Sequence, residues 1–337
     1  MDTTLQAKCD LLADNYLVTQ KSAKLDWSMA AALGALIYTN KDRQANEEAI
    51  RASRKLLKSK VSGFNSMRGN TNIALLVKMA TADSPEGYLD NVMDAYNLLK
   101  EGQGHHFGSE YEALAASCIV DFAKPEDYET VGRSTHEILR KMMKQHPLLT
   151  GREDTAVAAL LAMSGLDIDA TLAEADACYE TLKGDHFKLA KDSLQSIAMI
   201  LALNDMPVEQ KCARFNAMRQ AMKDVGDRMP VSTLPILAAL VDTDASPEEI
   251  AQYVHDAFHY LKKKSGFGSV LGIGIKMRLV MATAVTQQIV GKKSGASAEA
   301  AAASEAIATI ITQQVIEAII LTIIIVSVCV NASSSNS

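Results

Sequence analysis

Two histidines one helical turn apart have the spacing of a metal-binding pair. His255 and His259 fall in the segment 247–264, whose apolar residues recur every three or four positions and predict a helix. The apolar residues take the opposite side of that helix, so both imidazoles are expected in solvent. No third ligand is identifiable, and Asp256 stands where a zinc protease has glutamate. The favoured interpretation is a solvated pair, with a metal site at His255 and His259 as the alternative.

The other groups that could do chemistry lack the neighbours that the chemistry needs. The glycine-rich stretch 266–274 differs from a phosphate-binding loop, because no strand precedes it and no Lys-Ser or Lys-Thr follows. We interpret it as a connector between helices. Cys118, Cys178 and Cys212 match the apolar periodicity of their helices, and buried thiols are usually inert. The sequence therefore predicts no catalytic residue and no cofactor, and it favours a non-enzyme over an enzyme.

The elements that carry these residues repeat along the chain. Pro85, Pro125, Pro207 and Pro247 stand at polar turns 40, 82 and 40 positions apart, so a repeat without its proline is expected near 165–169. Before each turn lies an apolar segment rich in small residues. After it comes a longer amphipathic segment that ends in basic residues. This pattern predicts a helical hairpin that recurs roughly every 40 residues.

The stretch 232–264 specifies the hairpin best. Ser246 can cap the second helix, Pro247 suits its first position, and Glu249 completes a capping box. A lone hairpin cannot bury its apolar side, but hairpins stacked side by side form a continuous core. We therefore predict an all-α fold, an α-solenoid of about six helical-hairpin repeats followed by a long apolar C-terminal helix. A compact bundle around one centre is the alternative.

The predicted boundaries follow changes in composition. They give an N-terminal helix in 1–26, a helical-repeat domain in 27–290, a Gly/Ala-rich linker in 291–305, an apolar helix in 306–330 and a disordered tail in 331–337. As a helix, 306–330 would be about 37 Å long, enough to cross a membrane. Glu317 near its middle opposes insertion. Burial against the repeat domain or a second subunit therefore competes with membrane anchoring.

Charge and cysteine content limit the classes of function. The 337 residues carry a net charge of −6, so a general nucleic-acid binder is not expected. Aromatic residues make up only 5% of the chain, which favours helices over sheets. The N-terminal residues do not form a signal peptide, and no CxxC pair occurs, so we expect free thiols and a cytoplasmic protein. The cysteines are Cys9, Cys118, Cys178, Cys212 and Cys329.

Two arginines are the candidate partner-binding residues. Arg68 and Arg152 each precede the apolar helix of a repeat, two repeats apart, so stacking would place them along one edge of the solenoid. Arginine is a common binding hot spot at protein interfaces. Helix capping, or pairing with an acidic neighbour such as Glu153, explains both residues equally well.

Three segments carry a family resemblance: the arginine-initiated apolar run 151–163, the Tyr-Glu-Thr-Leu-Lys run 179–183, and the Ala/Gln-rich end with its serine tail. In these segments, and over nearly its whole length, the chain resembles an uncharacterised, mainly Gram-positive bacterial family. The resemblance brings no catalytic residues. We expect a non-enzymatic helical-repeat scaffold that binds a protein partner or self-associates through 306–330. The alternatives are an adaptor held at a membrane by that helix and an all-α enzyme with a site between hairpins.

Overall fold

Helices account for most of the backbone in the computed structural model. The model describes residues 1–23, 28–63, 65–69, 72–101, 109–145, 150–151, 154–183, 191–268 and 273–291. Over these ranges the chain contains α-helices, short 3-10 turns and loops, and no strand. The predicted all-α class is confirmed.

The helix bounds follow the hydrophobic periodicity of the sequence. In chain order the elements are α1 (Thr3–Ser22), α2 (Ser28–Asn40), α3 (Glu47–Lys60), η1 (Ser66–Arg68), α4 (Asn72–Thr81), α5 (Pro85–Glu101), α6 (Glu110–Phe122), η2 (Pro125–Asp127), α7 (Tyr128–Gln145), α8 (Thr155–Met163), α9 (Ile168–Leu182), α10 (Lys191–Leu201), α11 (Val208–Asp224), η5 (Val231–Thr233), α12 (Leu234–Ala238), α13 (Pro247–Leu261) and α14 (Ile275–Val290).

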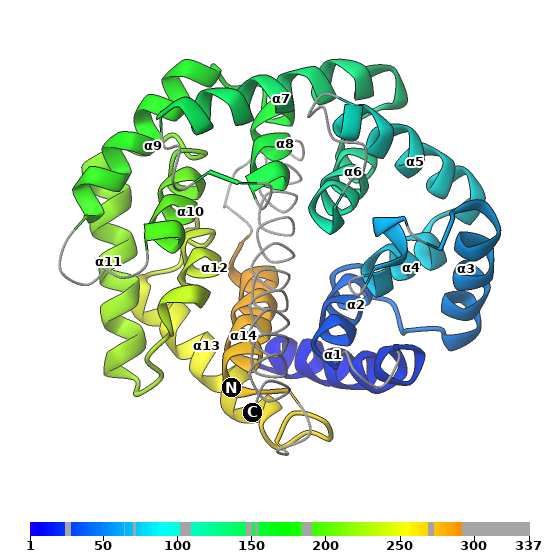
Figure 1. The fold of residues 1–337 in the computed structure, drawn as a ribbon. Helices are drawn as coiled ribbons and strands as arrows, with labels where there is room; N and C mark the ends of the chain where they lie inside the picture. Colours follow the sequence, from blue (N-terminus) through cyan, green and yellow to red (C-terminus); the bar gives the residue numbers. More distant parts are fainter. Residues whose placement is uncertain are drawn as a thin grey trace, which may run out of the picture.

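The helices form two layers. The apolar segments predicted from the sequence fall in α2, α4, α6, α8, α10 and α12, and the amphipathic segments fall in the helices that follow each of them. Figure 1 shows α3, α5, α7, α9 and α11 on the outside of a ring, with the even-numbered helices toward its inside. One buried cluster of apolar side chains runs from α1 to α14, and a smaller one fills the space between α7, α8, α9 and α10.

The turn predicted for the repeat without proline is present. Gly165, with a φ of 71°, follows α8, and Asp167 caps α9 by accepting a hydrogen bond from the amide of Ala170 at 2.7 Å. Only glycine adopts this backbone conformation at little steric cost, and a capping carboxylate satisfies an amide that the helix leaves free. The proline in the other repeats is therefore replaced here by a glycine turn and an aspartate cap.

Buried and half-buried polar side chains join neighbouring hairpins at the ends of their helices. Arg214 on α11 donates to the carbonyls of Val241 and Thr243, just after α12, at 2.7 and 2.8 Å. His136 on α7 lies 2.8 Å from the carbonyl of Leu99 in the last turn of α5. Such contacts satisfy carbonyls that have no partner within their own helix, and they place donors at the negative end of the helix dipole.

The first and last helices that the structure describes contact each other. Helix α1 packs on α13 and α14, and α14 packs on α2 (Figure 1). The side chains at this seam include Asp10 on α1, which pairs with Lys264 just after α13, and the rings of Tyr16 and Phe267, whose centroids are 5.2 Å apart. The hairpins therefore surround a common centre. The sequence predicted the hairpins, with an arrangement around one centre as the alternative, but it did not identify the residues that meet at this seam.

The glycine-rich connector meets α1 at the seam. Gly266 has a φ of 83°, and a Cβ atom at this position would lie 2.7 Å from the Tyr16 ring. Both facts require glycine. The amide of Ile273 donates to the Gly266 carbonyl at 2.8 Å, which brings the chain back toward α14. The described parts of 266–274 thus connect two helices, as the sequence indicated.

The apolar segment 306–330 lies outside the described residues, as do 331–337 and the linker apart from Gly291. The long C-terminal helix, its role in self-association and its role as a membrane anchor therefore stay predictions. Among the helices that the structure describes, none combines the length and the apolar character that crossing a bilayer requires.

Candidate functional site

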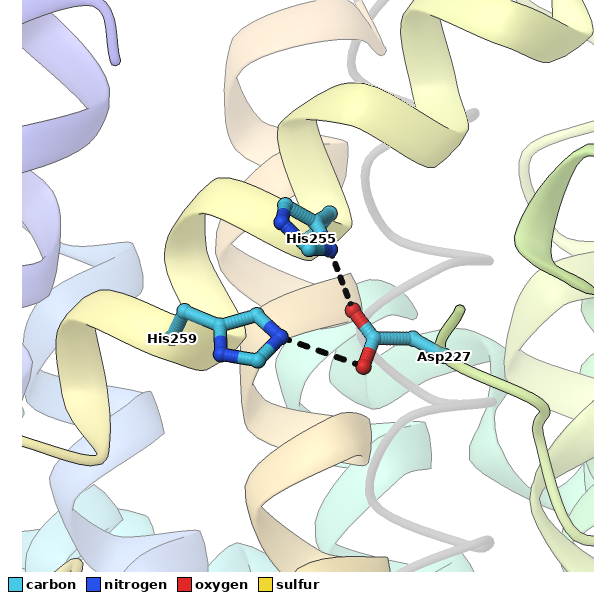
Figure 2. A group of neighbouring side chains, drawn as sticks. All are labelled: Asp227, His255 and His259. Carbon is cyan, nitrogen blue, oxygen red and sulfur yellow. Dashed lines mark hydrogen bonds and ion pairs between the residues drawn. The ribbon is translucent and has the colours of Figure 1, made fainter. Parts of the chain in front are cut away.

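The structure supplies a third ligand-type side chain beside the predicted histidine pair. Asp227, in the loop between α11 and η5, faces both His255 and His259 of α13 with its carboxylate (Figure 2). One carboxylate oxygen is 2.7 Å from His255 Nδ1, and the other is 3.3 Å from His259 Nε2. The two imidazole centroids are 4.3 Å apart. We call these three residues the Asp-His-His cluster.

Local sequence fixes α13 and with it the direction of the histidines. Ser246 and Glu249 form the predicted capping box, with hydrogen bonds of 2.7 and 3.1 Å between each side chain and the other residue's amide. Ile250 and Val254 are fully buried on the inward side of the helix. Because His255 and His259 are one turn apart, both imidazoles leave the helix on the side facing Asp227.

The end of α11 places Asp227. Gly226 has a φ of 87°, the amide of Asp227 donates to the Met222 carbonyl at 3.0 Å, and the amide of Gly226 donates to Lys223 at 3.0 Å. This pattern is a Schellman motif, in which glycine in the left-handed conformation ends the helix and reverses the chain. The reversal directs the next side chain, Asp227, toward α13.

The cluster is accessible on its histidine side. The side chains of His255 and His259 are 32% and 45% exposed, whereas that of Asp227 is 9% exposed. The carboxylate interacts electrostatically with the buried Arg278 of α14, whose guanidinium lies 4.4 Å from the centroid of the Phe258 ring. Burial lowers the pKa of Arg278, and attraction to Asp227 partly offsets that effect. The Asp227 carboxylate is thus nearly buried, and the two imidazoles are the exposed part of the cluster.

This arrangement offers one carboxylate oxygen and two imidazole nitrogens, which lie within 4.8 Å of one another. Zinc and ferrous iron are held by such mixed donor sets in proteins. The sequence found the histidines through their spacing, but it gave no sign of Asp227. The only local signal was Val-Gly-Asp at 225–227, a helix end followed by a carboxylate, and that signal does not name a partner.

Of the two predicted partner-binding arginines, the structure describes one. Arg68 ends η1, is half-buried, and donates from Nη1 to the Val61 carbonyl at 3.2 Å, just after α3. Its guanidinium therefore has a local structural contact with the end of α3. Arg152 lies outside the described residues, so their proposed common edge stays a prediction.

The described cysteines are free thiols buried in helix packing. Cys9, Cys118, Cys178 and Cys212 are each 0 or 1% exposed. Burial raises the pKa of Cys9 to about 12. The hydrogen bond with Cys212 and burial together raise the pKa of Cys178. Neither group is a ready nucleophile, because only the thiolate attacks. Cys329 lies outside the described residues.

Comparison with known proteins identifies a family but no function. Neither a search of curated proteins nor a search of solved structures returned a match. A family model described as protein of unknown function (DUF4003) matches residues 15–322, which is most of the chain. The match agrees with the resemblance seen in the sequence, and the chain belongs to the DUF4003 family.

Proposed function

We propose that this protein is a non-enzymatic helical-repeat scaffold, built from about six hairpin repeats, that binds a protein partner. The observation that carries the proposal is the continuity of the fold. A single apolar cluster connects α1 to α14, and side chains from one hairpin bind the helix ends of the next. Such a framework presents a broad, rigid outer surface rather than one enclosed reaction site.

Several buried charges support this proposal because they join helices. Lys78 on α4 pairs with Asp121 on α6 at 2.7 Å, and Lys211 on α11 pairs with Glu174 on α9 at 2.5 Å. Lys78 and Lys211 are 2% and 0% exposed. A buried charge is costly unless it is paired, so these residues fix the relative positions of adjacent hairpins. A binding surface assembled from several helices needs that rigidity.

The test uses the full-length protein with an affinity tag and purified binding partners. Partners recovered by chemical cross-linking are purified and titrated against the wild type, against Arg68→Ala with Arg152→Ala, and against the chain without 296–337. We expect a complex of defined stoichiometry and at least about a tenfold loss of affinity in the arginine variant. Arg51→Ala is the matched control, because Arg51 is exposed on α3 and, among the described residues, pairs with Glu47 of its own helix.

Two results would contradict the proposed scaffold function. One is a monomer in sedimentation that forms no complex with any purified candidate. The other is turnover of a small molecule by the purified chain. A dimer that disappears with 296–337 would instead support the self-associating form of the scaffold.

A further inference from the structure

We propose that Asp227, His255 and His259 bind one zinc ion, through a carboxylate oxygen, His255 Nδ1 and His259 Nε2, with the fourth position open to water. The proposal stands on the geometry of the Asp-His-His cluster. It is independent of the partner-binding role, because purified protein alone can be tested for it.

The distances require only a small adjustment, in which the 2.7 Å pair lengthens and the widest pair shortens. Ligand atoms in a tetrahedral zinc site lie about 2.0–2.2 Å from the metal and hence roughly 3.4 Å from one another. The cluster already has pairs at 2.7 and 3.3 Å, and its widest separation is within 4.8 Å. A shift of about 1 Å in exposed imidazoles is within ordinary rotamer freedom. The histidines share a rigid helix, so binding needs no rearrangement of the backbone.

The donor set selects the metal class. Two imidazole nitrogens with one carboxylate oxygen suit zinc and neighbouring transition metals, whereas Mg²⁺ and Ca²⁺ prefer sites made of oxygen ligands. Three protein ligands leave one tetrahedral position for water, and the exposure of His255 and His259 gives the ion a path to the site. Each coordinating nitrogen must be free of a proton, so a neutral imidazole that binds zinc carries its one proton on the other ring nitrogen.

The charge around the cluster limits affinity. Asp227 contributes one negative charge and the neutral histidines contribute none, so the bound ion would keep a net positive charge. Arg278, whose charge interacts with Asp227, opposes a dication. The site should therefore bind zinc more weakly than a structural site with several thiolates.

Asp256, which follows His255, indicates a structural role for the metal and not a catalytic one. Asp256 occupies the general-base position of the HExxH pattern, yet it accepts from Gln252 at 2.9 Å and lies 3.4 Å from the N-terminal amine. It is therefore engaged with its own helix and with the start of the chain. The zinc ion joins α13 to the end of α11, so its role is to cross-link two outer helices.

The experiment is titration of metal-free, full-length protein with Co²⁺, a spectroscopic substitute for zinc, followed by displacement with Zn²⁺. We expect one equivalent of Co²⁺ to give the visible absorption of a tetrahedral site, and Zn²⁺ to remove it. Asp227→Asn, which keeps the side-chain shape, and His259→Gln should each weaken binding at least about tenfold. Zinc should raise the melting temperature of the wild type more than that of the variants.

Glu248→Gln is the control, because Glu248 is exposed in the first turn of α13 and supplies no ligand, and this variant should bind Co²⁺ as the wild type does. The four histidines outside the described residues are intact in every variant, so they report any background binding. The proposal is wrong if Asp227→Asn and His259→Gln bind Co²⁺ as tightly as the wild type. It is also wrong if the wild type shows no tetrahedral absorption.

Discussion

The hydroxyl of Tyr260 donates a hydrogen bond to Asp10 at 2.9 Å, although 250 positions separate them in the sequence. Lys264 adds an ion pair to the same carboxylate at 2.5 Å. Burial alone would raise the pKa of Asp10, but the hydrogen bonds from Lys264 and Tyr260 outweigh it and lower the pKa. The hydrogen bond to Asp10 raises the pKa of Lys264 to about 12. Both pKa shifts show that this contact favours the charged forms of Asp10 and Lys264.

The ion pair between Asp10 and Lys264 should make the unfolding free energy depend on pH. The pKa of Asp10 is lower in the folded protein than its ordinary 3.8. Its contribution to stability is therefore fully present above pH 3.8 and is lost as the pH falls through the folded pKa. The pKa of Lys264 is higher than its ordinary 10.5, so its contribution is present below 10.5 and is lost as pH rises toward about 12.

Asp10→Asn tests this dependence. We expect the variant to lose about 0.5–1 kcal/mol of unfolding free energy at pH 7, since the pair is partly exposed. The difference from the wild type should shrink below pH 4 and above pH 11, measured by urea denaturation. A difference that is constant across this range would show that the charge of Asp10 is not involved.

The buried Lys211 should contribute more to the unfolding free energy than an exposed lysine does. Its ammonium donates to the carbonyls of Leu201 and Asn204, at 2.9 and 2.7 Å, as well as pairing with Glu174. Lys211→Met leaves a carboxylate and two helix-end carbonyls without their donor, so we expect a loss of about 3 kcal/mol in denaturant unfolding. Lys183→Met is the control, because Lys183 pairs with Glu180 in solvent, and it should unfold like the wild type.

The capping box should contribute measurably to α13. Ser246→Ala removes the acceptor for the Glu249 amide and should lower the unfolding free energy by about 1 kcal/mol. Ser246→Asp restores an acceptor at the same position and should recover most of the loss. If both variants lose the same stability, the hydroxyl acts through packing and not as a cap.

The thiols of the described helices should react only after unfolding. At pH 8 a pKa of about 12 leaves roughly one Cys9 in ten thousand as thiolate. We expect iodoacetamide to leave Cys9, Cys118, Cys178 and Cys212 unmodified in native protein and to modify all four in denaturant, as measured by peptide mass spectrometry. Rapid native labelling of any of them would place that thiol in contact with solvent.

Hydrophobic periodicity predicted local structure well and long-range contacts poorly. The turn near Asp167 and the helix that follows Pro247 were both predicted, because caps and apolar spacing act within a few residues. Asp227 was not predicted as a neighbour of His255, since their 28-residue separation in the sequence is closed by the packing of α11 on α13. The pairing of Asp10 with Tyr260 escaped prediction for the same reason.

The contact between Asp10 and Tyr260 can form only late in synthesis of the chain on the ribosome. At about 5–20 residues per second, the 250 residues between Asp10 and Tyr260 take roughly 12–50 s to synthesise. Until then α13 and α14 cannot cover the side of α1 that they contact in the folded protein. Chaperone binding and misassembly between neighbouring nascent chains should therefore concentrate at the N-terminal helix during this interval.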